Sequence, residues 1–449
     1  MKIPPLVPRR VSIARAFKFL KNPIPLITQN LNEYGKTYAF HIGGSKLAIM
    51  TAEPIVIKHI LQKNNKNYYK SEIQSGTVGY FIGNGLLTSN GPYWLQQRRL
   101  IQPGFHKKKL EAIFNIIKDE IDGFTAEINN RDNVEIDIRE AMQTLTFRVI
   151  TKSIFSKGIN EEELNEFRTK IDAIQEFIIK QIRLPFLTWY HKISGQKKKH
   201  KGLADETKAT MNSFVQSRRN DTNANYDDLL DMLLAARYED DGKGMTNNQI
   251  IEEALIIFVA GHETSSNALA WIFYLLSVNL KELKKLRAEI KEVIGNAPLK
   301  MEDLRNIDYS RMIIEEGMRI YPPAWIVDRV ALEDDEVNGY RVPKGTMIAP
   351  FIYGVHHDPD IWDQPETFNP ERFSKENKKD IGHFEYFPFG GGPRLCIGMG
   401  MAMMEMQMIL IEFVRNFDFE LLNPEDIKLK TLITLQPENP IKMRVTKRQ

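Results

Sequence analysis

The stretch Phe389-Gly-Gly-Gly-Pro-Arg-Leu-Cys-Ile-Gly398 is the most restrictive run of residue types in the chain. Three glycines and a proline favour a turn that no ordinary helix or strand adopts. Cys396 ends this turn, directly before the apolar run MGMAMMEMQMILIEF, which predicts a long helix. Free backbone N–H groups and the positive end of a helix dipole favour a thiolate over a thiol. The pattern therefore predicts a rigidly held thiolate that serves as a metal ligand or a nucleophile.

Residue chemistry alone leaves other roles for Cys396 open. A single cysteine is most often a small buried hydrophobic residue, and it cannot form an internal disulfide. A nucleophile needs a positioned base, and His356, His357 and His383 lie in the same region of the sequence. A zinc site is less favoured because it requires several cysteine or histidine ligands at close spacing.

Composition places the chain among ordinary globular proteins. Its 449 residues are 42% hydrophobic and 27% charged, with 61 basic and 58 acidic residues. The formal net charge of +3 is too small to indicate nucleic-acid binding. The N-terminal lead, residues 1–30, contains neither a run of about 20 apolar residues nor a signal-peptide core. We therefore expect a cytoplasmic protein without a transmembrane anchor.

The first two thirds of the chain read as mainly helical. TYAFHI and KLAIMT flank Gly43-Gly44-Ser45, which predicts a β-hairpin, and helical patterns then extend to about residue 300. They include EPIVIKHILQ, the segment after Pro92, NVEIDIREAMQTLTFRVITKSIF and a long helix over 247–278. Two polar stretches, 194–202 and 218–228, are expected to be loops.

The last third mixes structure types. A helix containing EEGMRI should end at Tyr321, because proline cannot continue it, and Asn338-Gly339 predicts a tight hairpin. Residues 356–392 form a long stretch rich in proline and glycine. Loops of this length inside a compact domain often have a functional role. The tail, FDFELL and IKMRV, should form strands. We expect one mainly α-helical domain with small β-sheets (α+β) over 1–449, without a fused reductase.

The cysteine stretch resembles the haem-binding loop of cytochromes P450, Phe-x-x-Gly-x-Arg-x-Cys-x-Gly. Each fixed position of that motif is matched here, by Phe389, Gly392, Arg394, Cys396 and Gly398. The resemblance implies a cytochrome P450 fold that encloses haem b between a long central helix and the cysteine loop. It also implies that Cys396 is the iron ligand.

A second match lies on a helix and in the stretch after it. Glu316 and Arg319, three residues apart, share one helix face, and alone they would be a surface ion pair worth about 0–1 kcal/mol. Their context EEGMRIYPP resembles the K-helix motif of the family, and FNPERF resembles the motif that supplies Arg372. The resemblance implies a buried structural triad of Glu316, Arg319 and Arg372 that braces the cysteine loop.

The sequence Ala260-Gly-His-Glu-Thr-Ser265 lies within the long helix. A mid-helix glycine and a threonine that bonds back to the preceding turn can bend a core helix and do nothing more. The segment resembles the I-helix motif of the family. That resemblance implies an oxygen-binding groove in which Thr264, fed by the acid Glu263, delivers protons.

Further basic and aromatic positions resemble haem-binding residues of the family. Trp94 and Arg98 lie one helical turn apart, which alone indicates a cation–π or surface pair. Their spacing resembles the C-helix motif whose side chains bind a haem propionate. Arg329 and Arg394 match two more propionate-binding positions, and arginine suits carboxylates because it binds them in a bidentate way.

A haem-thiolate monooxygenase that inserts one oxygen atom from O₂ into a C–H bond is the function these resemblances imply. The result would be hydroxylation, or oxidative O-demethylation where the carbon bears an ether oxygen. Electrons would come from a separate ferredoxin or flavodoxin with an NAD(P)H-dependent reductase, docking by charge near Cys396. We expect a monomer.

Two alternative functions stay open, a peroxide-driven peroxygenase and a non-catalytic haem sensor. The acid–alcohol pair Glu263-Thr264 argues against both. Candidate substrates are fatty acids, terpenoids or carotenoids, and a small methyl ether such as a methylated sugar. By analogy with the family, the pocket should be lined by 74–91, by Pro323–Val327 with Trp325 as an aromatic wall, and by Leu435–Pro437.

Overall fold

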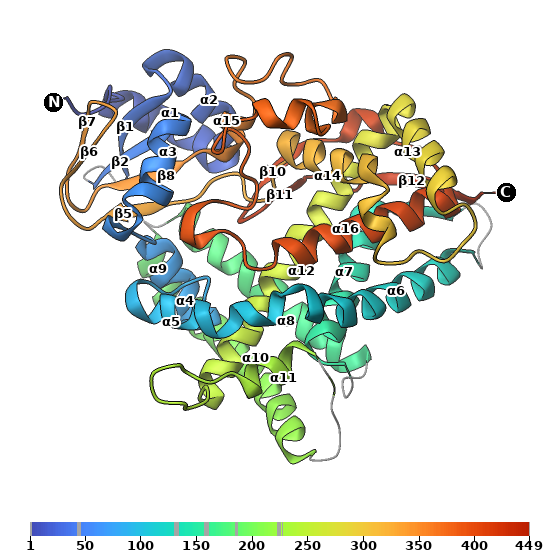
Figure 1. Ribbon diagram of the computed structural model, residues 1–449. Helices are drawn as coiled ribbons and strands as arrows, with labels where there is room; N and C mark the ends of the chain where they lie inside the picture. The colour runs from blue at the N-terminus through green and yellow to red at the C-terminus, as the bar shows by residue number, and fades with distance from the viewer. Residues whose placement is uncertain are drawn as a thin grey trace. The chain divides into compact units, whose positions relative to one another are not determined.

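The computed structural model describes residues 2–42, 46–129, 134–156, 161–184, 187–221, 226 and 228–448 (Figure 1). It divides into two compact units. The first comprises 1–106, 154–260 and 327–350, and the second comprises 107–153, 261–326 and 351–449. The division falls inside two helices, so each unit is built from segments far apart in the sequence. The predicted single domain remains a prediction.

A mixed sheet is the scaffold of the first unit. Its strand order is β1-β2-β8-β5-β3, in which β2 and β8 are parallel and the other neighbours are antiparallel. The predicted N-terminal hairpin is confirmed as β1–β2, although Gly43-Gly44-Ser45 lies outside the described residues. The predicted Asn338-Gly339 hairpin is also confirmed, since both residues have positive φ between β6 and β7. The strands of this unit are β1 Thr37–Ile42, β2 Lys46–Thr51, β3 Tyr68–Tyr69, β5 Arg329–Ala331, β6 Asp335–Val337, β7 Tyr340–Val342 and β8 Met347–Pro350.

Helices make up most of the remaining first unit. The second of them, α2, begins with Pro23 after Asn22, whose side chain accepts a hydrogen bond from the Ile24 N–H, as an N-cap residue does. The α-helices are α1 Arg9–Lys21, α2 Pro23–Tyr34, α3 Pro54–Lys58, α4 Gly79–Ile82, α5 Gly91–Ile101, α8 Glu161–Arg183, α9 Thr188–Ile193, α10 Gln196–Asn220 and α11 Leu229–Ala235. Short 3-10 and π-helical turns are η1 His59–Lys63, η2 Asn65–Asn67, η3 Ile73–Val78 and η4 Gln102–Phe105.

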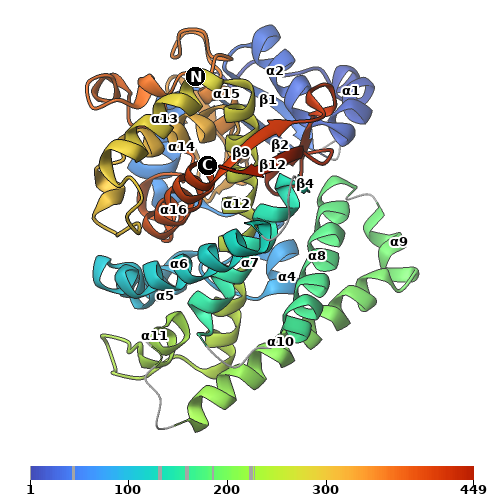
Figure 2. The same cartoon turned by 90° about the vertical axis from the view of Figure 1, so that its right-hand side faces the viewer.

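The second unit combines buried helices with small sheets. Its largest sheet is antiparallel with strand order β4-β12-β9, which Figure 2 shows beside α7. Its strands are β4 Val134–Asp137, β9 Phe417–Leu421, β10 Leu429–Thr431, β11 Leu435–Pro437 and β12 Lys442–Lys447. Its helices and turns are α6 Lys107–Asn129, α7 Ile138–Ile154, α13 Leu280–Val293, η6 Asp303–Arg305, α14 Asp308–Ile320, α15 Ile352–His356, η7 Pro370–Phe373, η8 Asn377–Asp380, η9 Gly392–Arg394, α16 Met399–Asn416 and η10 Pro424–Asp426.

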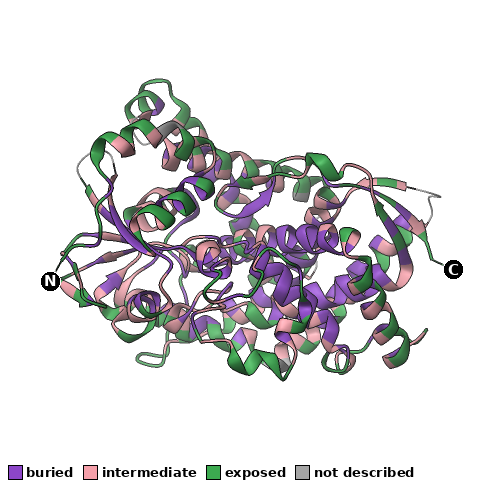
Figure 3. Cartoon of the chain, turned by 90° about the horizontal axis from the view of Figure 1, so that it is seen from above, coloured by how far each residue is buried: buried purple, intermediate pink, exposed green. Residues whose placement is uncertain are grey.

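The long helix α12 (Asn247–Val278) has the bounds that the sequence predicts. Its residues 268–273 are 2% exposed or less, and α16 is buried from Met404 to Val414. Figure 3 draws buried residues of the chain in purple. In the second unit the Trp271 ring stacks on Tyr321, the C-cap residue that follows α14 and precedes Pro322. Among the described residues no helix is both long and apolar enough to cross a membrane.

Two sequence predictions of local structure are wrong. The basic run at 194–202 is not a loop beyond Gly195, because α10 begins at Gln196 and includes 218–220 as well. Lysine and glutamine are good helix formers, so the run continues as a helix once Gly195, at φ +72°, has allowed the turn. The stretch that starts at Asn133 is not helical throughout, because Val134–Asp137 pairs with β12.

Candidate functional site

The cysteine turn has the irregular backbone that its glycines indicate. Gly390 and Gly392 have φ values of +74° and +66°, which residues with side chains rarely adopt. Gly391 is required for a different reason, since a Cβ atom there would lie 2.5 Å from the ring of Phe384. The Cys396 N–H donates to the Phe389 carbonyl at 3.0 Å, and this hydrogen bond closes the turn. The turn therefore presents Cys396 on a defined backbone.

The Cys396 side chain is exposed in this protein, and α16 begins three residues later, at Met399. Cysteine is among the residue types most often buried. An exposed cysteine at the end of a constrained turn therefore does not behave as a core hydrophobic residue. The helix start after it supplies the backbone dipole that favours a thiolate.

Glu316 and Arg319 form a fully buried ion pair on α14, and both are 0% exposed. The Arg319 guanidinium donates to both carboxylate oxygens of Glu316, at 2.7 and 2.9 Å. Glu316 Oε1 also accepts from the Asn369 N–H at 2.9 Å and lies 3.4 Å from Arg372 Nε. A shorter hydrogen bond of Arg372, 2.5 Å, is donated to the Asp363 carbonyl. The structure thus brings the three predicted residues together, with Arg372 in the weakest contact.

His356 connects this ion pair to the cysteine turn. Arg319 donates to the His356 carbonyl at 2.7 Å, and the imidazole Nε2 accepts from the Phe387 N–H at 3.1 Å. Burial lowers the pKa of His356 well below its usual value, and the nearby His357 and the Arg319 guanidinium lower it further, so the ring is neutral. From the sequence, His356 was a possible base for a nucleophilic cysteine. Its Nε2 instead holds the backbone two residues before Phe389.

Glu263 on α12 is held by a hydroxyl group from the C-terminal tail. Thr434 Oγ1 donates to Glu263 Oε1 at 2.5 Å and accepts from Asn267 Nδ2 at 3.1 Å. Asn267 and Thr434 are buried, at 0% and 4% exposure, whereas Glu263 and Thr264 are only partly buried. The hydrogen-bonded chain Asn267–Thr434–Glu263 therefore fixes an acid that is the chain neighbour of Thr264.

Gly261 allows α7 to approach α12 closely. A Cβ atom at Gly261 would lie 2.8 Å from Ile150 Cδ1 on α7. Thr146, also on α7, donates to the His262 carbonyl at 3.3 Å. The mid-helix glycine thus has a packing role, and α12 continues through it as one helix.

A second acid lies behind the same part of α12. Glu405 on α16 is 3% exposed and hydrogen bonds to Ser265, the residue after Thr264. Burial raises the pKa of Glu405 to about 8, and the Ser265 hydrogen bond opposes this only partly. Glu405 is therefore largely protonated at neutral pH.

The predicted propionate ligands lie in separate parts of the structure. Trp94 and Arg98 are one turn apart on α5 and are partly buried, as is Arg394 in the 3-10 turn of the cysteine segment. Arg329, on β5, is 8% exposed and donates to the Asp328 carbonyl at 2.6 Å.

The residues present fit a haem in three respects. Burial lowers the pKa of Arg329, and among the described residues its side chain has a backbone carbonyl but no carboxylate as hydrogen-bond acceptor. A haem propionate would supply that acceptor. Ala260, in the segment for which the resemblance implies an oxygen-binding groove, is exposed in the middle of a helix that is otherwise mostly buried. The exposed Cys396 supplies a soft ligand for iron.

Comparison with protein families decides the identity of this fold. The model of the family "Cytochrome P450" matches residues 4–445. The chain belongs to the cytochrome P450 family. It is therefore a haem-dependent monooxygenase, and its cofactor is haem b.

Relatives and solved structures match nearly the whole chain. Cytochrome P450 3A29 of Sus scrofa is 30% identical over 434 residues, which cover 93% of this chain and 86% of the relative. Lithocholate 6-beta-hydroxylase of Mesocricetus auratus is 29% identical over the same shares. The crystal structure of the cytochrome P450DA heme domain has a TM-score of 0.89 at 22% identity and covers 99% of this chain and 97% of its own. A triple mutant of that heme domain has a TM-score of 0.90 at 21% identity, with 100% and 98% covered. The predicted fold class, mainly α with small sheets, is confirmed.

Several residues of this P450 site escaped the sequence analysis. Thr434 contacts Glu263, and Glu405 contacts Ser265, from positions far along the chain, and Asn267, about one helical turn after Glu263, hydrogen bonds to Thr434. Glu405 lies nine residues after Cys396 in an apolar helix. A carboxylate within such an apolar run was the local sequence signal that could have identified Glu405. Thr434 had no local signal, because its role depends on a tertiary contact.

Proposed function

We propose that this P450 uses O₂, two externally supplied electrons and two protons to insert one oxygen atom into a substrate C–H bond, while the second oxygen atom leaves as water. Cys396 binds the haem iron as a thiolate, and Glu263 and Thr264 move protons toward the haem. The thiolate-bound haem supplies the O–O cleavage chemistry. The product is an alcohol or, where the oxidised carbon bears an ether oxygen, the products of O-demethylation.

One observation carries the proton-delivery part of the proposal. Glu263 Oε1 accepts a 2.5 Å hydrogen bond from Thr434, and Glu263 adjoins Thr264 on a helix segment that is partly open. A general acid must be positioned before it can transfer a proton efficiently. A peroxide-driven enzyme or a sensor has no need of such a positioned acid–alcohol pair.

The remaining predicted residues hold the cofactor. Arg329, Arg98 and Arg394 would pair with the propionates, Trp94 would add an N–H donor, and Phe389 would pack beside the thiolate. Charge-assisted hydrogen bonds from arginine to carboxylate are among the stronger polar contacts in proteins. Within this scheme the Glu316–Arg319 pair, aided by Arg372, keeps the backbone around the cysteine turn in place through His356.

An acidic electron-transfer protein, a ferredoxin or flavodoxin, is the proposed redox partner. The second unit has a shallow surface hollow lined by Asp308, Arg311, Lys375, Lys378 and Lys379. Arg311 and Lys378 are neutralised in part by Glu315. Exposed lysines of this kind increase the rate of encounter with an acidic protein. Function as a monomer in the cytoplasm stays a prediction from the sequence.

Substrate contact is proposed for the tip of the β10–β11 hairpin. Leu435–Pro437, predicted to line the pocket, are buried, whereas Ile433 at the tip is 43% exposed. Trp325 is 7% exposed and donates its indole N–H to the Leu432 carbonyl at 3.1 Å. Trp325 thus orients the hairpin, and Ile433 offers the apolar contact.

Turnover with different oxidants tests the reaction class. Purified holoenzyme is supplied with a generic ferredoxin, its reductase and NADPH, or with hydrogen peroxide alone, and product is measured by mass spectrometry. We expect oxygenated product to form faster with the electron-transfer chain than with peroxide alone, and we expect Thr264→Ala to divert reducing equivalents into peroxide. Product formed with peroxide alone at equal or higher rates would overturn the proposal.

A spectral screen identifies the substrate class. Fatty acids, terpenoids, carotenoids and methylated sugars are titrated while the haem absorption band is recorded. A substrate that displaces water from the iron shifts this band. Formaldehyde release with a methylated sugar would establish O-demethylation, whereas a hydroxylated fatty acid or terpenoid would establish hydroxylation. Cys396→Ala should abolish the reduced-CO thiolate spectrum, and its survival would refute the ligand assignment.

A further inference from the structure

Residues 71–89 of the first unit form a segment whose two ends are tied together. Asn90 accepts from the Lys70 N–H at 2.9 Å and donates to the Lys70 carbonyl at 3.3 Å. Beside this tie, Asp328 accepts hydrogen bonds from Ser71 Oγ and Gln74 Nε2, both at 2.8 Å. The base of the segment is therefore fixed to the sheet.

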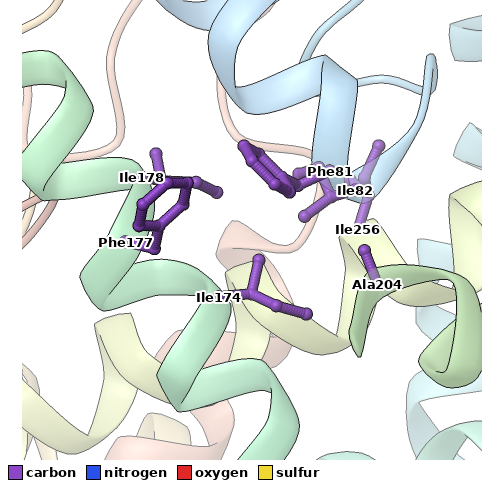
Figure 4. Close-up of a cluster of buried hydrophobic side chains, with 7 residues drawn as sticks. All are labelled: Phe81, Ile82, Ile174, Phe177, Ile178, Ala204 and Ile256. Atoms are coloured by element: carbon purple, nitrogen blue, oxygen red, sulfur yellow. The ribbon is translucent and has the colours of Figure 1, made fainter. Parts of the chain in front are cut away.

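The middle of the segment packs on an apolar cluster from three long helices. Figure 4 shows Phe81 and Ile82 of α4 facing side chains of α8, α10 and α12. All members of this cluster are 4% exposed or less. The partner residues are Ile174, Phe177, Ile178, Ala204 and Ile256. Apolar packing holds α4 close to α12, but it is non-directional and does not set the position of the following turn.

Two successive carboxylates of α12 bind that turn by its backbone. Glu252 Oε2 accepts from the Asn84 N–H, and Glu253 Oε2 accepts from the Leu86 N–H, each at 3.0 Å. The carboxylates occupy the space in which two side chains would otherwise lie. A Cβ atom at Gly85 would fall 2.7 Å from the carboxyl carbon of Glu253, and one at Gly83 would overlap the Glu252 side chain. The turn and the two acids therefore fit together closely.

Glu253 and Glu252 differ in how deeply they are buried and in how fully their carboxylates are hydrogen bonded. Glu252 is partly exposed and paired with Lys208 at 2.8 Å. Glu253 is 1% exposed, its Oε1 has no hydrogen-bond partner among the described residues, and burial raises its pKa to about 7. A buried, half-satisfied carboxyl group is destabilising. Its presence calls for a role other than stability.

We propose that Glu253 is a positioning residue that fixes the turn 83–86 on α12 and thereby sets the position of the whole 71–89 segment. The functional half of this inference rests on the proposed function and on the expectation, by analogy with the family, that 74–91 lines the substrate pocket. There Glu253 determines how tightly the pocket closes on a ligand, and it takes no part in the chemistry.

Hydrogen exchange of the holoenzyme tests the anchor directly. Glu253→Ala removes the acceptor, so exchange of peptides covering 79–90 should become at least about tenfold faster, the change that 1.4 kcal/mol produces. Glu253→Gln keeps an acceptor oxygen of the same reach and should restore most of the protection. Glu252→Ala is the matched control, and its effect should be smaller because water can reach the Asn84 N–H. Unchanged exchange in 79–90, or an equal increase in all peptides, would overturn the anchor.

Binding of 4-phenylimidazole, followed by the shift of the haem absorption band, tests the functional half. Glu253→Ala should change the dissociation constant at least about fivefold while the reduced-CO spectrum stays normal, and Glu253→Gln should reverse most of the change. An unchanged dissociation constant in a variant with faster local exchange would overturn control of the pocket. Neither the exchange measurement nor the binding measurement requires turnover. Failure of the proposed monooxygenase reaction would therefore be seen separately, because the wild-type enzyme would then form no product in the turnover assay.

Discussion

Glu316 on α14 and Glu405 on α16 are both buried in the second unit, but their surroundings differ. Glu316 is 0% exposed and receives two hydrogen bonds from Arg319 and one from the Asn369 N–H. Glu405 is 3% exposed and hydrogen bonds to Ser265, and its Oε1 has no hydrogen-bond partner among the described residues. Glu316 thus has a buried guanidinium and a backbone N–H as partners, whereas Glu405 has a single hydroxyl and a pKa that burial raises to about 8.

This difference shows that two almost equally buried acids in this protein can differ in how far their partners compensate for the loss of water. A guanidinium group and a backbone N–H compensate the loss of water around Glu316, whereas a single hydroxyl cannot compensate it around Glu405. Glu263 is partly buried and accepts a hydrogen bond from Thr434. Changing each acid or its partner separately tests what these surroundings contribute.

The largest effect is expected for Glu316→Ala. The substitution leaves the Arg319 charge buried without its counter-ion, which costs about 3–5 kcal/mol of unfolding free energy. Urea unfolding of the holoenzyme, followed by circular dichroism and by the haem absorption band, measures the loss. Glu316→Gln serves as the control, because it keeps one acceptor oxygen and should lose less. A loss under about 1 kcal/mol would mean that the pair behaves as a surface ion pair.

Glu405→Gln should stabilise the protein, and increasingly so as the pH rises. Burial raises the folded-state pKa of Glu405 from 4.5 to about 8. A raised pKa means that its contribution to stability is complete below about pH 4.5 and is lost as the pH rises through 8. The neutral amide has no such dependence.

Unfolding free energies of wild type and Glu405→Gln, measured from pH 5 to pH 8.5, test this expectation. The two proteins should be similar at pH 5 and separate by a few kcal/mol at pH 8.5, since each pKa unit corresponds to about 1.4 kcal/mol. Glu253 and Glu289, whose pKa values burial raises to about 7, add losses of the same sign to both proteins. The difference between the curves therefore isolates Glu405, and parallel curves would show that Glu405 is ionised when buried.

Thr434→Val is expected to have an intermediate effect, about 1–3 kcal/mol on stability from the unsatisfied Glu263 and Asn267 groups. If Thr434 also positions the proton donor, the fraction of NADPH that yields product should fall several-fold, with a larger solvent isotope effect. Thr434→Ser retains the hydroxyl and should keep both properties. Loss of stability without a change in product yield would limit Thr434 to a structural role.

The sequence predicted the parts of this fold and site that depend on local patterns. The bounds of α12, the end of α14 before Pro322 and the glycine turn before Cys396 follow from helix periodicity, proline geometry and glycine φ values. The pairing of Glu316 with Arg319 followed from their spacing on one helix face. Such features need only a few neighbouring residues.

Features that depend on tertiary contact were missed or mistaken. Thr434 and Glu263 are separated by 171 residues, and no local pattern connects them. Val134–Asp137 was assigned to a helix because its pairing with β12 joins residues that are even further apart in the sequence. The neutral state of Glu405 depends on how many groups exclude water from it, which the sequence does not specify.

The smallest effect concerns exposed charges, the opposite extreme to Glu316. Lys375 and Lys379 line the basic hollow, and reversing both to Glu should change unfolding free energy little, since exposed charges contribute about 0–1 kcal/mol. The rate of reduction by an acidic ferredoxin should instead fall several-fold at low ionic strength, and the difference should vanish in high salt because the interaction is screened. Stopped-flow reduction under carbon monoxide measures this rate. Lys58→Glu with Lys63→Glu, on the first unit, provides the charge-matched control. Equal slowing by both pairs would indicate an effect of net charge, and the hollow would then not be the docking surface.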